Sequence, residues 1–536
     1  MKLSRRLALV ATLAATATIV AGCAGPAADP KTGDSANQPR PGGTVVIAWT
    51  SDQNGVDAAS LNNVRENITR QLTDSLVFRN PDSGEFEPWL AESWKVSDDV
   101  KEYTFTLRQD VTFNDGTKLD AEVVKANIEA LQQPGVHSTP AGLVAGVKVE
   151  VVDEYTVKFT LPRGNAGFLA NLSRADVGIV SAATAAKPLA ERQTSIDGSG
   201  PYSLVSWTVN EGAVIKRRDD YNWAPASISH DGPAYIEEIR YQVIPEAQVI
   251  YESLKSGEVD FYESVGGLFV DDLKANGVNV SGLLSPPGTA GEAPVNVSNP
   301  ILRDKRVRQA LTHGIDRDAI NQAIWLGKDQ PASSIFNRSN PYWEDLSEYL
   351  SYDPEQSIEL LEEAGWTEIG SDGIRVKDGV RLSLRLAQDS PTTQIFKEQW
   401  KKIGVEAVLD PPLPAEANQR ILTGEYDVTY WEHTYPDSDI LRANYGKTTG
   451  SNRSILDLDN PEDKHLDDLL QQQLSISDPE ERKKVVSEAA TILVRDAYTI
   501  PVLERTKVWG FTSRLHDVKA NGVDQIFYNA WVDDAE

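Results

Sequence analysis

The sequence has 536 residues, a formal net charge of −28, 40% hydrophobic residues and a single cysteine. This is the composition of a globular protein with length for two or three domains, so disorder of the whole chain is excluded. The acidity argues against nucleic acid or an anionic lipid surface as a partner. One cysteine allows no disulfide within the chain, so stability has to come from burial and hydrogen bonding.

The first 22 residues have the pattern of a secretory signal peptide. Three basic residues precede an uncharged run over residues 7–22, which is too short to span a bilayer. Cys23 follows directly after Val20-Ala21-Gly22, and these four residues resemble the lipobox of bacterial lipoproteins. Ser4-Arg5-Arg6 leaves open whether export uses the general secretory or the twin-arginine route.

Cys23 is the predicted site of lipidation. We expect diacylglycerol on its thiol to hold the mature protein on the cell membrane, facing the extracytoplasmic side. The alternative is a small buried core cysteine, but the neighbouring sequence offers no core for it to enter. Residues 23–40 are rich in Ala, Pro, Gly, Asp and Ser without apolar periodicity, so they predict a flexible tether.

The first half of the folded region predicts mainly strands. An apolar strand over residues 44–49 runs into a polar segment over residues 50–55. Apolar and polar residues alternate within residues 94–113, which predicts antiparallel sheet that turns at Asn114-Asp115-Gly116. Asp120 then caps a helix that reaches Leu131.

A hairpin and clearer helices follow. Residues 147–161 alternate around a turn at Asp153-Glu154, which predicts two antiparallel strands. Residues 353–365 carry a capping Asp, a first-turn Pro and a C-terminal Gly, the pattern of a helix.

A βαβ unit is predicted near residue 400. It combines a strand over residues 381–386, a helix over residues 392–403 and a parallel strand over residues 405–409. The whole pattern indicates two lobes of α/β type, with the ligand in the crevice between them.

Sequence patterns of catalytic and metal sites are missing. The sequence contains no Gly-x-Ser-x-Gly elbow and no His-Glu-x-x-His motif, and its six histidines are scattered singly. Gly446-Lys447-Thr448 lacks the first glycine of a phosphate loop, because that position is Leu441. The sequence therefore predicts no catalysis, no cofactor and no metal site, and a secreted hydrolase is the alternative from a different class.

Several segments, in one order along nearly the whole mature chain, resemble bacterial extracellular solute-binding proteins of the peptide/nickel type, family 5. These proteins are the receptor components of ABC importers. The residues themselves also have structural interpretations, since Asp304 and Asp316 can cap helices, and Gly198 and Gly200 permit a sharp turn. The segments are Gly42-Gly43-Thr44, Pro88-Trp89-Leu90-Ala91-Glu92-Ser93-Trp94 with Tyr103-Thr104-Phe105, Phe113-Asn114-Asp115-Gly116-Thr117, Gly198-Ser199-Gly200-Pro201-Tyr202, Ser256-Gly257-Glu258-Val259-Asp260, Asp304-Lys305-Arg306-Val307-Arg308-Gln309-Ala310-Leu311 and Ile315-Asp316-Arg317.

The resemblance implies an α/β, two-lobed periplasmic-binding-protein-like fold of type II, in its large three-subdomain variant, with mixed sheets and a hinge. Lobe I would span residues 41–288, with a strand-rich subdomain inserted at about 81–196. Lobe II would span residues 289–497, and residues 498–536 would return to lobe I. Such a monomer would close on its ligand and be recognised in the closed state by the permease subunits of an ABC transporter.

The resemblance also implies a ligand-facing segment after Tyr426-Asp427. Its aromatic, acidic and imidazole side chains suit short peptides, because rings make apolar contact and carboxylates accept hydrogen bonds from an ammonium group. Thr434 is uncharged where peptide receptors of this family commonly carry an aspartate. His433 gives the alternative of nickel or a metal-chelate or opine-like solute. The predicted ligand-binding residues are Trp431, Glu432, His433, Tyr435 and Asp437 in this segment, with Trp49, Thr50 and Asp52 at the end of the first strand.

Each of these residues also has a structural interpretation. Trp431 and Tyr435 are candidates for the core, because alternate residues of a strand face inward. Glu432 and Asp437 are candidates for ordinary exposed surface, and a lone His433 for a structural histidine.

Overall fold

The structure is a computed structural model in which residues 39–536 form one compact unit. It describes residues 38–51, 55–57, 66–133, 136, 138–230, 232–282, 287–413, 416, 419–420, 423–435, 437–447, 456–521 and 524–533. The predicted signal peptide, Cys23, most of the tether and Asp52 lie outside these residues. Within them, no helix is both long and apolar enough to cross a membrane.

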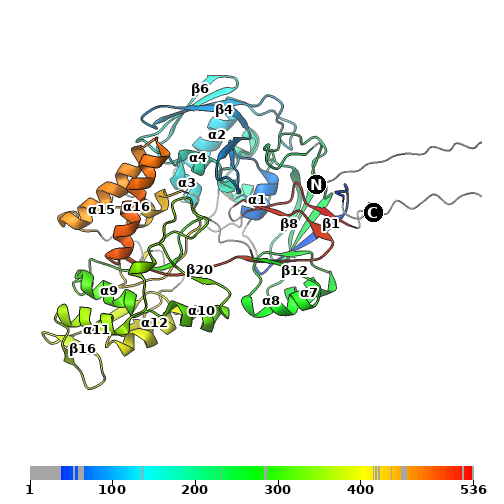
Figure 1. Cartoon of the computed structure of the whole chain (residues 1–536). Helices are drawn as coiled ribbons and strands as arrows, with labels where there is room; N and C mark the ends of the chain where they lie inside the picture. Colours follow the sequence, from blue (N-terminus) through cyan, green and yellow to red (C-terminus); the bar gives the residue numbers. More distant parts are fainter. Residues whose placement is uncertain are drawn as a thin grey trace, which may run out of the picture. The chain divides into compact units, whose positions relative to one another are not determined.

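A mixed sheet of seven described strands forms the right-hand part of the molecule (Figure 1). β1 confirms the predicted first strand and pairs in parallel with β10 along its whole length. β21, from near the C-terminus, pairs antiparallel with both β11 and β12. In sheet order the strands are β12 (Asn279–Gly282), β21 (Val508–Phe511), β11 (Phe261–Tyr262), β1 (Thr44–Trp49), β10 (Glu238–Val243), β9 (Gly212–Arg217) and β8 (Tyr202–Thr208).

A four-stranded antiparallel sheet lies at the top of Figure 1, and α2 lies close to it. Its hairpins confirm the predicted pairings, although the first of them ends at Leu107 and not at residue 113. Asp120 caps α2 by accepting a hydrogen bond from the Val123 amide, as predicted. The strands are β4 (Ala91–Val96), β5 (Glu102–Leu107), β7 (Thr156–Thr160) and β6 (Lys148–Asp153).

The remaining elements of the first half and the C-terminal residues surround these sheets. The helices are α1 (Glu66–Leu72), α2 (Ala121–Leu131), α3 (Thr139–Leu143), α4 (Phe168–Leu172), η3 (Ala175–Val177), α5 (Ala182–Ala185), α6 (Leu189–Arg192), α7 (Ala247–Ser256), η4 (Gly267–Phe269) and α8 (Val270–Ala275). Short strand pairs are β2 (Val77–Arg79) with β3 (Phe86–Pro88), β22 (Leu515–His516) with β25 (Trp531–Val532), and β23 (Lys519–Asn521) with β24 (Asp524–Ile526).

The second half contains the predicted βαβ unit. β18 (Ser383–Leu386) and β19 (Glu406–Leu409) are parallel and are connected by α12 (Pro391–Lys402), so this prediction is confirmed with ends shifted by one or two residues. The other sheets are β13 (Gly291–Pro294), β20 (Thr499–Glu504) and β14 (Gln330–Pro331), and β15 (Glu368–Ile369), β16 (Arg375–Lys377) and β17 (Val380–Arg381).

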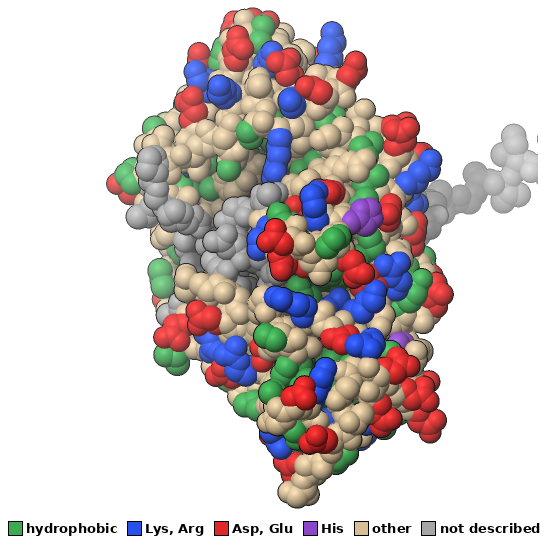
Figure 2. All heavy atoms as spheres, turned by 90° about the vertical axis from the view of Figure 1, so that its left-hand side faces the viewer, with side chains coloured by type: hydrophobic (Ala, Val, Ile, Leu, Met, Phe, Trp, Pro, Cys, Tyr) green, Lys and Arg blue, Asp and Glu red, His purple; other side chains and the backbone are tan. Residues whose placement is uncertain are grey.

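The helices of the second half lie on the left-hand side of Figure 1, the side that faces the viewer in Figure 2. Asp304, Asp316 and Asp353 cap the helices that the sequence places after them, because each carboxylate accepts a backbone hydrogen bond of the first turn. The helices are α9 (Lys305–His313), α10 (Arg317–Trp325), η5 (Ser347–Tyr349), α11 (Pro354–Glu363), α14 (Asp439–Tyr445), α15 (Pro461–Gln472), η6 (Gln473–Ser475) and α16 (Pro479–Arg495).

The buried apolar side chains form four clusters, which fall into two groups along the chain. Two clusters take their buried residues from 45–278 and 509–532. The other two take theirs from 293–503. The chain therefore has two separate sets of cores, and it passes between them after β12 and again after β20.

Gly198 and Gly200 are explained by a close backbone approach. A Cβ atom at Gly198 would lie 1.8 Å from the Leu72 carbonyl oxygen, and one at Gly200 would lie 2.6 Å from the Gln71 carbonyl oxygen. The Gly200 amide donates a hydrogen bond to the Leu72 carbonyl at 3.0 Å. Only glycine fits here, because a side chain would collide with the last turn of α1.

Candidate functional site

The segment over residues 430–435 is held by backbone hydrogen bonds to the beginning of the second half. The amide of Glu292 donates to the Trp431 carbonyl at 2.8 Å, and the Trp431 amide donates back to Glu292 at 2.9 Å. The Thr289 amide donates to the His433 carbonyl at 2.9 Å. The segment is therefore an extended strip next to the point where the chain enters the second set of cores.

Glu292 fixes the indole of Trp431. The carboxylate is fully buried and accepts hydrogen bonds from Trp431 Nε1 at 3.2 Å, Tyr445 OH at 2.9 Å and Thr499 Oγ1 at 2.9 Å. Burial raises the pKa of Glu292 to about 7, against the opposing effect of these donors. Sequence reasoning missed this residue, because its partners are far away in the chain and nothing in Gly291–Pro294 indicates a buried acid.

Glu432, the residue after Trp431, lies opposite the cationic side chain of Arg505. Their side chains are 29% and 44% exposed, and the closest N···O distance between them is 3.6 Å. The Arg505 guanidinium lies 4.2 Å from the ring centroid of Trp325. Partial burial raises the pKa of Glu432, and Arg505 opposes this rise. The pair is loose and partly accessible, so both groups have room for another partner.

Trp431 and His433 are half-buried, and their rings meet edge to face at a centroid distance of 5.4 Å. These two side chains therefore lie side by side on one strip, and ligand contact by either stays a prediction. No group of three or more His, Cys, Asp or Glu side chains with the arrangement of a metal site occurs in the described chain.

Tyr435 contacts the first half of the chain. Its hydroxyl donates a hydrogen bond to Asn171 Oδ1 on α4. The Arg174 guanidinium lies 6.0 Å from the centroid of the Tyr435 ring. Tyr435 thus connects the two halves of the chain, whose buried cores are separate. A change in the distance between these cores would break its contacts with Asn171 and Arg174.

Asp437 is buried and is bound by Arg482 of α16. Arg482 donates to both carboxylate oxygens at 2.6 and 2.7 Å. The pKa of Asp437 is lowered: burial opposes this, and Arg482 with Arg79 outweighs it. In the structure the carboxylate is occupied by a side chain of the protein, and ligand contact by Asp437 stays a prediction.

Trp49 and Thr50 lie at the end of β1. Trp49 is fully buried, and its ring stacks on Tyr241 at a centroid distance of 4.5 Å. Its Nε1 and the Tyr241 hydroxyl have no hydrogen-bond partner among the described residues. Thr50 is half-buried. The described contacts of Trp49 are with its own sheet, whereas Tyr435 and Asp437 meet the first half at α4.

The comparisons with known proteins decide the family. Residues 85–453 match the family described as bacterial extracellular solute-binding proteins, family 5 Middle, which is more than half of the sequence. This chain belongs to that family. The solute-binding protein is therefore a component of transport and not an enzyme, as predicted.

Relatives and solved structures agree with this assignment. The solute-binding protein is 26% identical to the glutathione-binding protein GsiB of Salmonella paratyphi A, over 77% of this chain and 80% of the relative. Its structure is similar to NikA from Brucella suis in complex with Fe(III)-EDTA, with a TM-score of 0.79, 24% identity and coverage of 91% and 100% of the two chains.

A third comparison, with DppA from Helicobacter pylori in complex with the peptide STSA, gives a TM-score of 0.74 and 22% identity over 92% and 99% of the chains. The predicted fold class, α/β with two lobes and mixed sheets, is confirmed. The predicted family is confirmed as well.

Proposed function

We propose that this protein is a lipid-anchored receptor on the extracytoplasmic side of the cell membrane, which captures short peptides and delivers them to the permease of an ABC transporter. Family membership supports solute capture. The relatives and neighbours that match include one named for glutathione, a tripeptide, and one solved with a peptide. Cys23 and the preceding 22 residues support the anchor.

The observation that carries the peptide proposal is the arrangement of Glu432, Arg505 and Trp431. A peptide carries an ammonium group and a carboxylate, and Glu432 and Arg505 offer one partner for each. Trp431, which precedes Glu432 in the chain, is half-buried and offers a flat apolar surface, held in one orientation by Glu292. Partial burial strengthens both charged contacts, because water screens them less.

The predicted site residues extend this proposal to both lobes. We assign His433, Tyr435 and Asp437 to the ligand-facing strip of lobe II, and Trp49, Thr50 and Asp52 to lobe I. The two sets of cores support the predicted lobes, and the two passages of the chain between them support a hinge. Ligand contacts to both lobes would favour the closed state, because only differential binding shifts such an equilibrium.

A second candidate is a metal chelate or an opine-like solute. It is favoured by the structural similarity to NikA in complex with Fe(III)-EDTA and by the proximity of His433 to Trp431. In this case Arg505 would bind a carboxylate of the chelate, and His433 would face the metal.

Native mass spectrometry of the purified protein, followed by calorimetric titration, tests the proposal. Titration with glutathione, alanyl tripeptides, Ni²⁺ with histidine, and Fe(III)-EDTA separates the two candidates.

We expect a peptide to bind, and Trp431→Ala and Arg505→Gln each to weaken binding by roughly tenfold or more. Lys507→Gln is the control for Arg505, since it removes a nearby cation that has no ion pair in the described chain. Chelate binding without any peptide binding would overturn the peptide assignment.

A further inference from the structure

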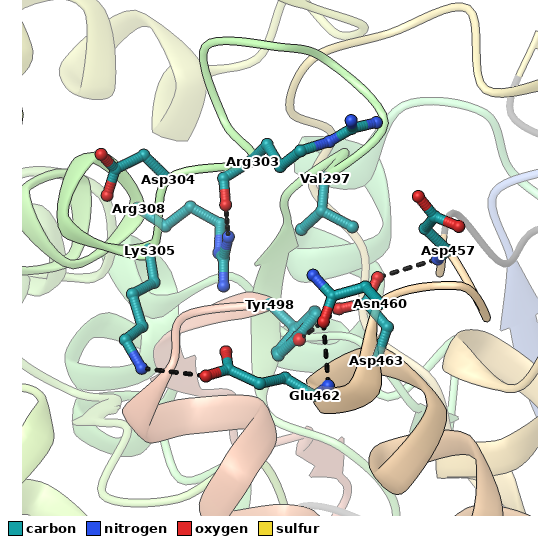
Figure 3. Close-up of a pocket in the computed structure, with 10 residues that line it drawn as sticks. All are labelled: Val297, Arg303, Asp304, Lys305, Arg308, Asp457, Asn460, Glu462, Asp463 and Tyr498. Carbon is teal, nitrogen blue, oxygen red and sulfur yellow. Dashed lines mark hydrogen bonds and ion pairs between the residues drawn. The ribbon is translucent and has the colours of Figure 1, made fainter.

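A cavity lies within the second half of the chain, and none of residues 430–435 lines it. It encloses about 220 Å³ between the N-terminal ends of α9 and α15 (Figure 3). A volume this large holds several water molecules at about 30 Å³ each, or one ligand of amino-acid size. Its walls include Val297, Lys305, Arg308, Glu462 and Tyr498.

Arg308 is the buried cation of this cavity. The residue is 3% exposed, and its guanidinium lies 4.7 Å from the centroid of the Tyr498 ring. Nε donates to the Asp496 carbonyl at 2.9 Å, and Nη1 donates to the carbonyls of Leu302 and Arg303 at 2.9 and 3.0 Å. Nη2 has no hydrogen-bond partner in the described chain, and Figure 3 shows the end of the Arg308 side chain pointing toward Glu462.

The carboxylates near Arg308 make hydrogen bonds to other side chains. Asp304 binds Arg306 at 2.6 and 3.0 Å. Asp463 accepts from the Tyr498 hydroxyl at 2.6 Å. Among the described residues Arg308 therefore makes hydrogen bonds only to backbone carbonyls, although a desolvated guanidinium gains most from an anionic partner.

Glu462 provides the opposite charge across the cavity. Its side chain is 63% exposed, and its only ion pair in the described chain is with Lys305 at 3.5 Å. In Figure 3 its carboxylate points toward Arg308 from the other side of the space. The cavity thus presents a hydrogen-bond donor at one end and a carboxylate at the other.

We propose that this cavity binds a small zwitterion, a free α-amino acid, at a site separate from the proposed peptide site. The carboxylate of the ligand accepts from Arg308 Nη2, and its ammonium group donates to Glu462. A ligand that carries only a negative charge would bind Arg308, but the negative charge of Glu462 would repel it. The walls at Val297 and Tyr498 give the side chain an apolar surface.

Ligand-observed NMR with an equimolar mixture of the proteinogenic amino acids tests this site, followed by titration of the strongest binder. Acetate, methylammonium and inorganic phosphate serve as separate probes. We expect an amino acid to bind more tightly than acetate or methylammonium. Arg308→Lys should weaken binding by roughly tenfold or more, because lysine cannot reproduce the planar fork.

Glu462→Gln keeps the test decisive if Arg308→Lys does not fold, since Glu462 lies on the surface. We expect it to weaken binding by about threefold to tenfold. Glu480→Gln is a matched control, because Glu480 also follows a first-turn proline, at the beginning of α16. It should leave binding unchanged.

Three outcomes would overturn the proposal. The first is the absence of any amino-acid binding below roughly 10 mM. The second is binding of phosphate in its place, with the same dependence on Arg308. The third is amino-acid binding that Trp431→Ala abolishes and Glu462→Gln leaves intact, which would place the ligand at the strip over residues 430–435.

Discussion

Asp437 and Arg482 form a bidentate ion pair with N···O distances of 2.6 and 2.7 Å, in which both side chains are less than one-tenth exposed. The pair connects the chain just after the strip over residues 430–435 to α16. It also lies directly against the first half, because a Cβ atom at Gly167 would be 2.6 Å from Asp437 Oδ1. One ion pair therefore supports both the strip and its contact with α4.

Asp437→Asn should destabilise the protein by about 3 to 5 kcal/mol, because it leaves the buried Arg482 without a counter-charge. Urea unfolding measures this change. The double variant Asp437→Leu with Arg482→Met should be less destabilised than Asp437→Asn, since no charge remains buried. Equal stability of Asp437→Asn and the wild type would show that the pair contributes nothing.

Gly167→Ala should weaken the contact between the two halves. The new methyl group meets a carboxylate that cannot move without breaking its bonds to Arg482. Gly142→Ala is the matched control, because a Cβ atom there has nothing within 4 Å and lies in a helix, where alanine is favoured. Thermal unfolding should show a lower Tm for the first variant and an unchanged or higher Tm for the second.

The stability of the protein should fall as pH rises toward 7. The pKa of Glu292 is about 7 in the folded state and near 4.3 in an unfolded chain, so the folded state binds the proton more strongly. This contribution is complete below pH 4.3, is lost as pH rises through 7, and is on the order of 3 kcal/mol.

Glu292→Gln should reduce the pH dependence of unfolding, because the amide does not titrate. Its oxygen can still accept from Trp431, and its NH₂ group can donate to the hydroxyls of Tyr445 and Thr499. In this variant the stability should still fall somewhat as pH rises, because burial also raises the pKa of Asp74, to about 6. Urea unfolding of both proteins between pH 4 and 8 checks this, and parallel profiles would contradict it.

Tyr435→Phe should favour a more open protein. The variant keeps the ring near Arg174 and loses the hydroxyl that donates to Asn171. We expect a larger radius of gyration by small-angle X-ray scattering and ligand binding weakened by about twofold to tenfold. Tyr352→Phe is the control, since Tyr352 is 42% exposed. Identical scattering from all three proteins would show that the hydroxyl does not hold the halves together.

Cys23→Ser should be exported without acylation and should lose its membrane retention. Its ligand binding should equal that of the wild type, because Cys23 precedes residues 39–536, which form the compact unit. Fractionation and ligand titration measure the two properties separately. Unchanged membrane attachment would refute the assignment of Cys23 as the lipidation site.

Elements with local signals were predictable from the sequence. Asp120, Asp304 and Asp353 each precede a helix and cap it, and both partners of these hydrogen bonds lie within three residues of each other. The βαβ unit was predictable for the same reason. The glycine that ends its helix and the alternating apolar residues of its strands lie close together in the sequence.

Pairings between distant segments were not predictable. β21 lies between β11 and β12, more than two hundred residues earlier in the chain, and its four residues carry no sign of that position. The strip over residues 430–435 was found through the family resemblance, but its supports were not. Arg482, Asn171 and Glu292 are 45, 264 and 139 residues from their partners.

The position of β21 between β11 and β12 determines when the seven-stranded sheet can be completed. β12 cannot join the rest of the sheet until residues 508–511 have been synthesised, because these residues supply the strand between β11 and β12. The second set of cores needs nothing beyond Leu503 and can form earlier. β12 therefore waits for a partner strand that is synthesised more than two hundred residues later, and its edge stays unpaired during that interval.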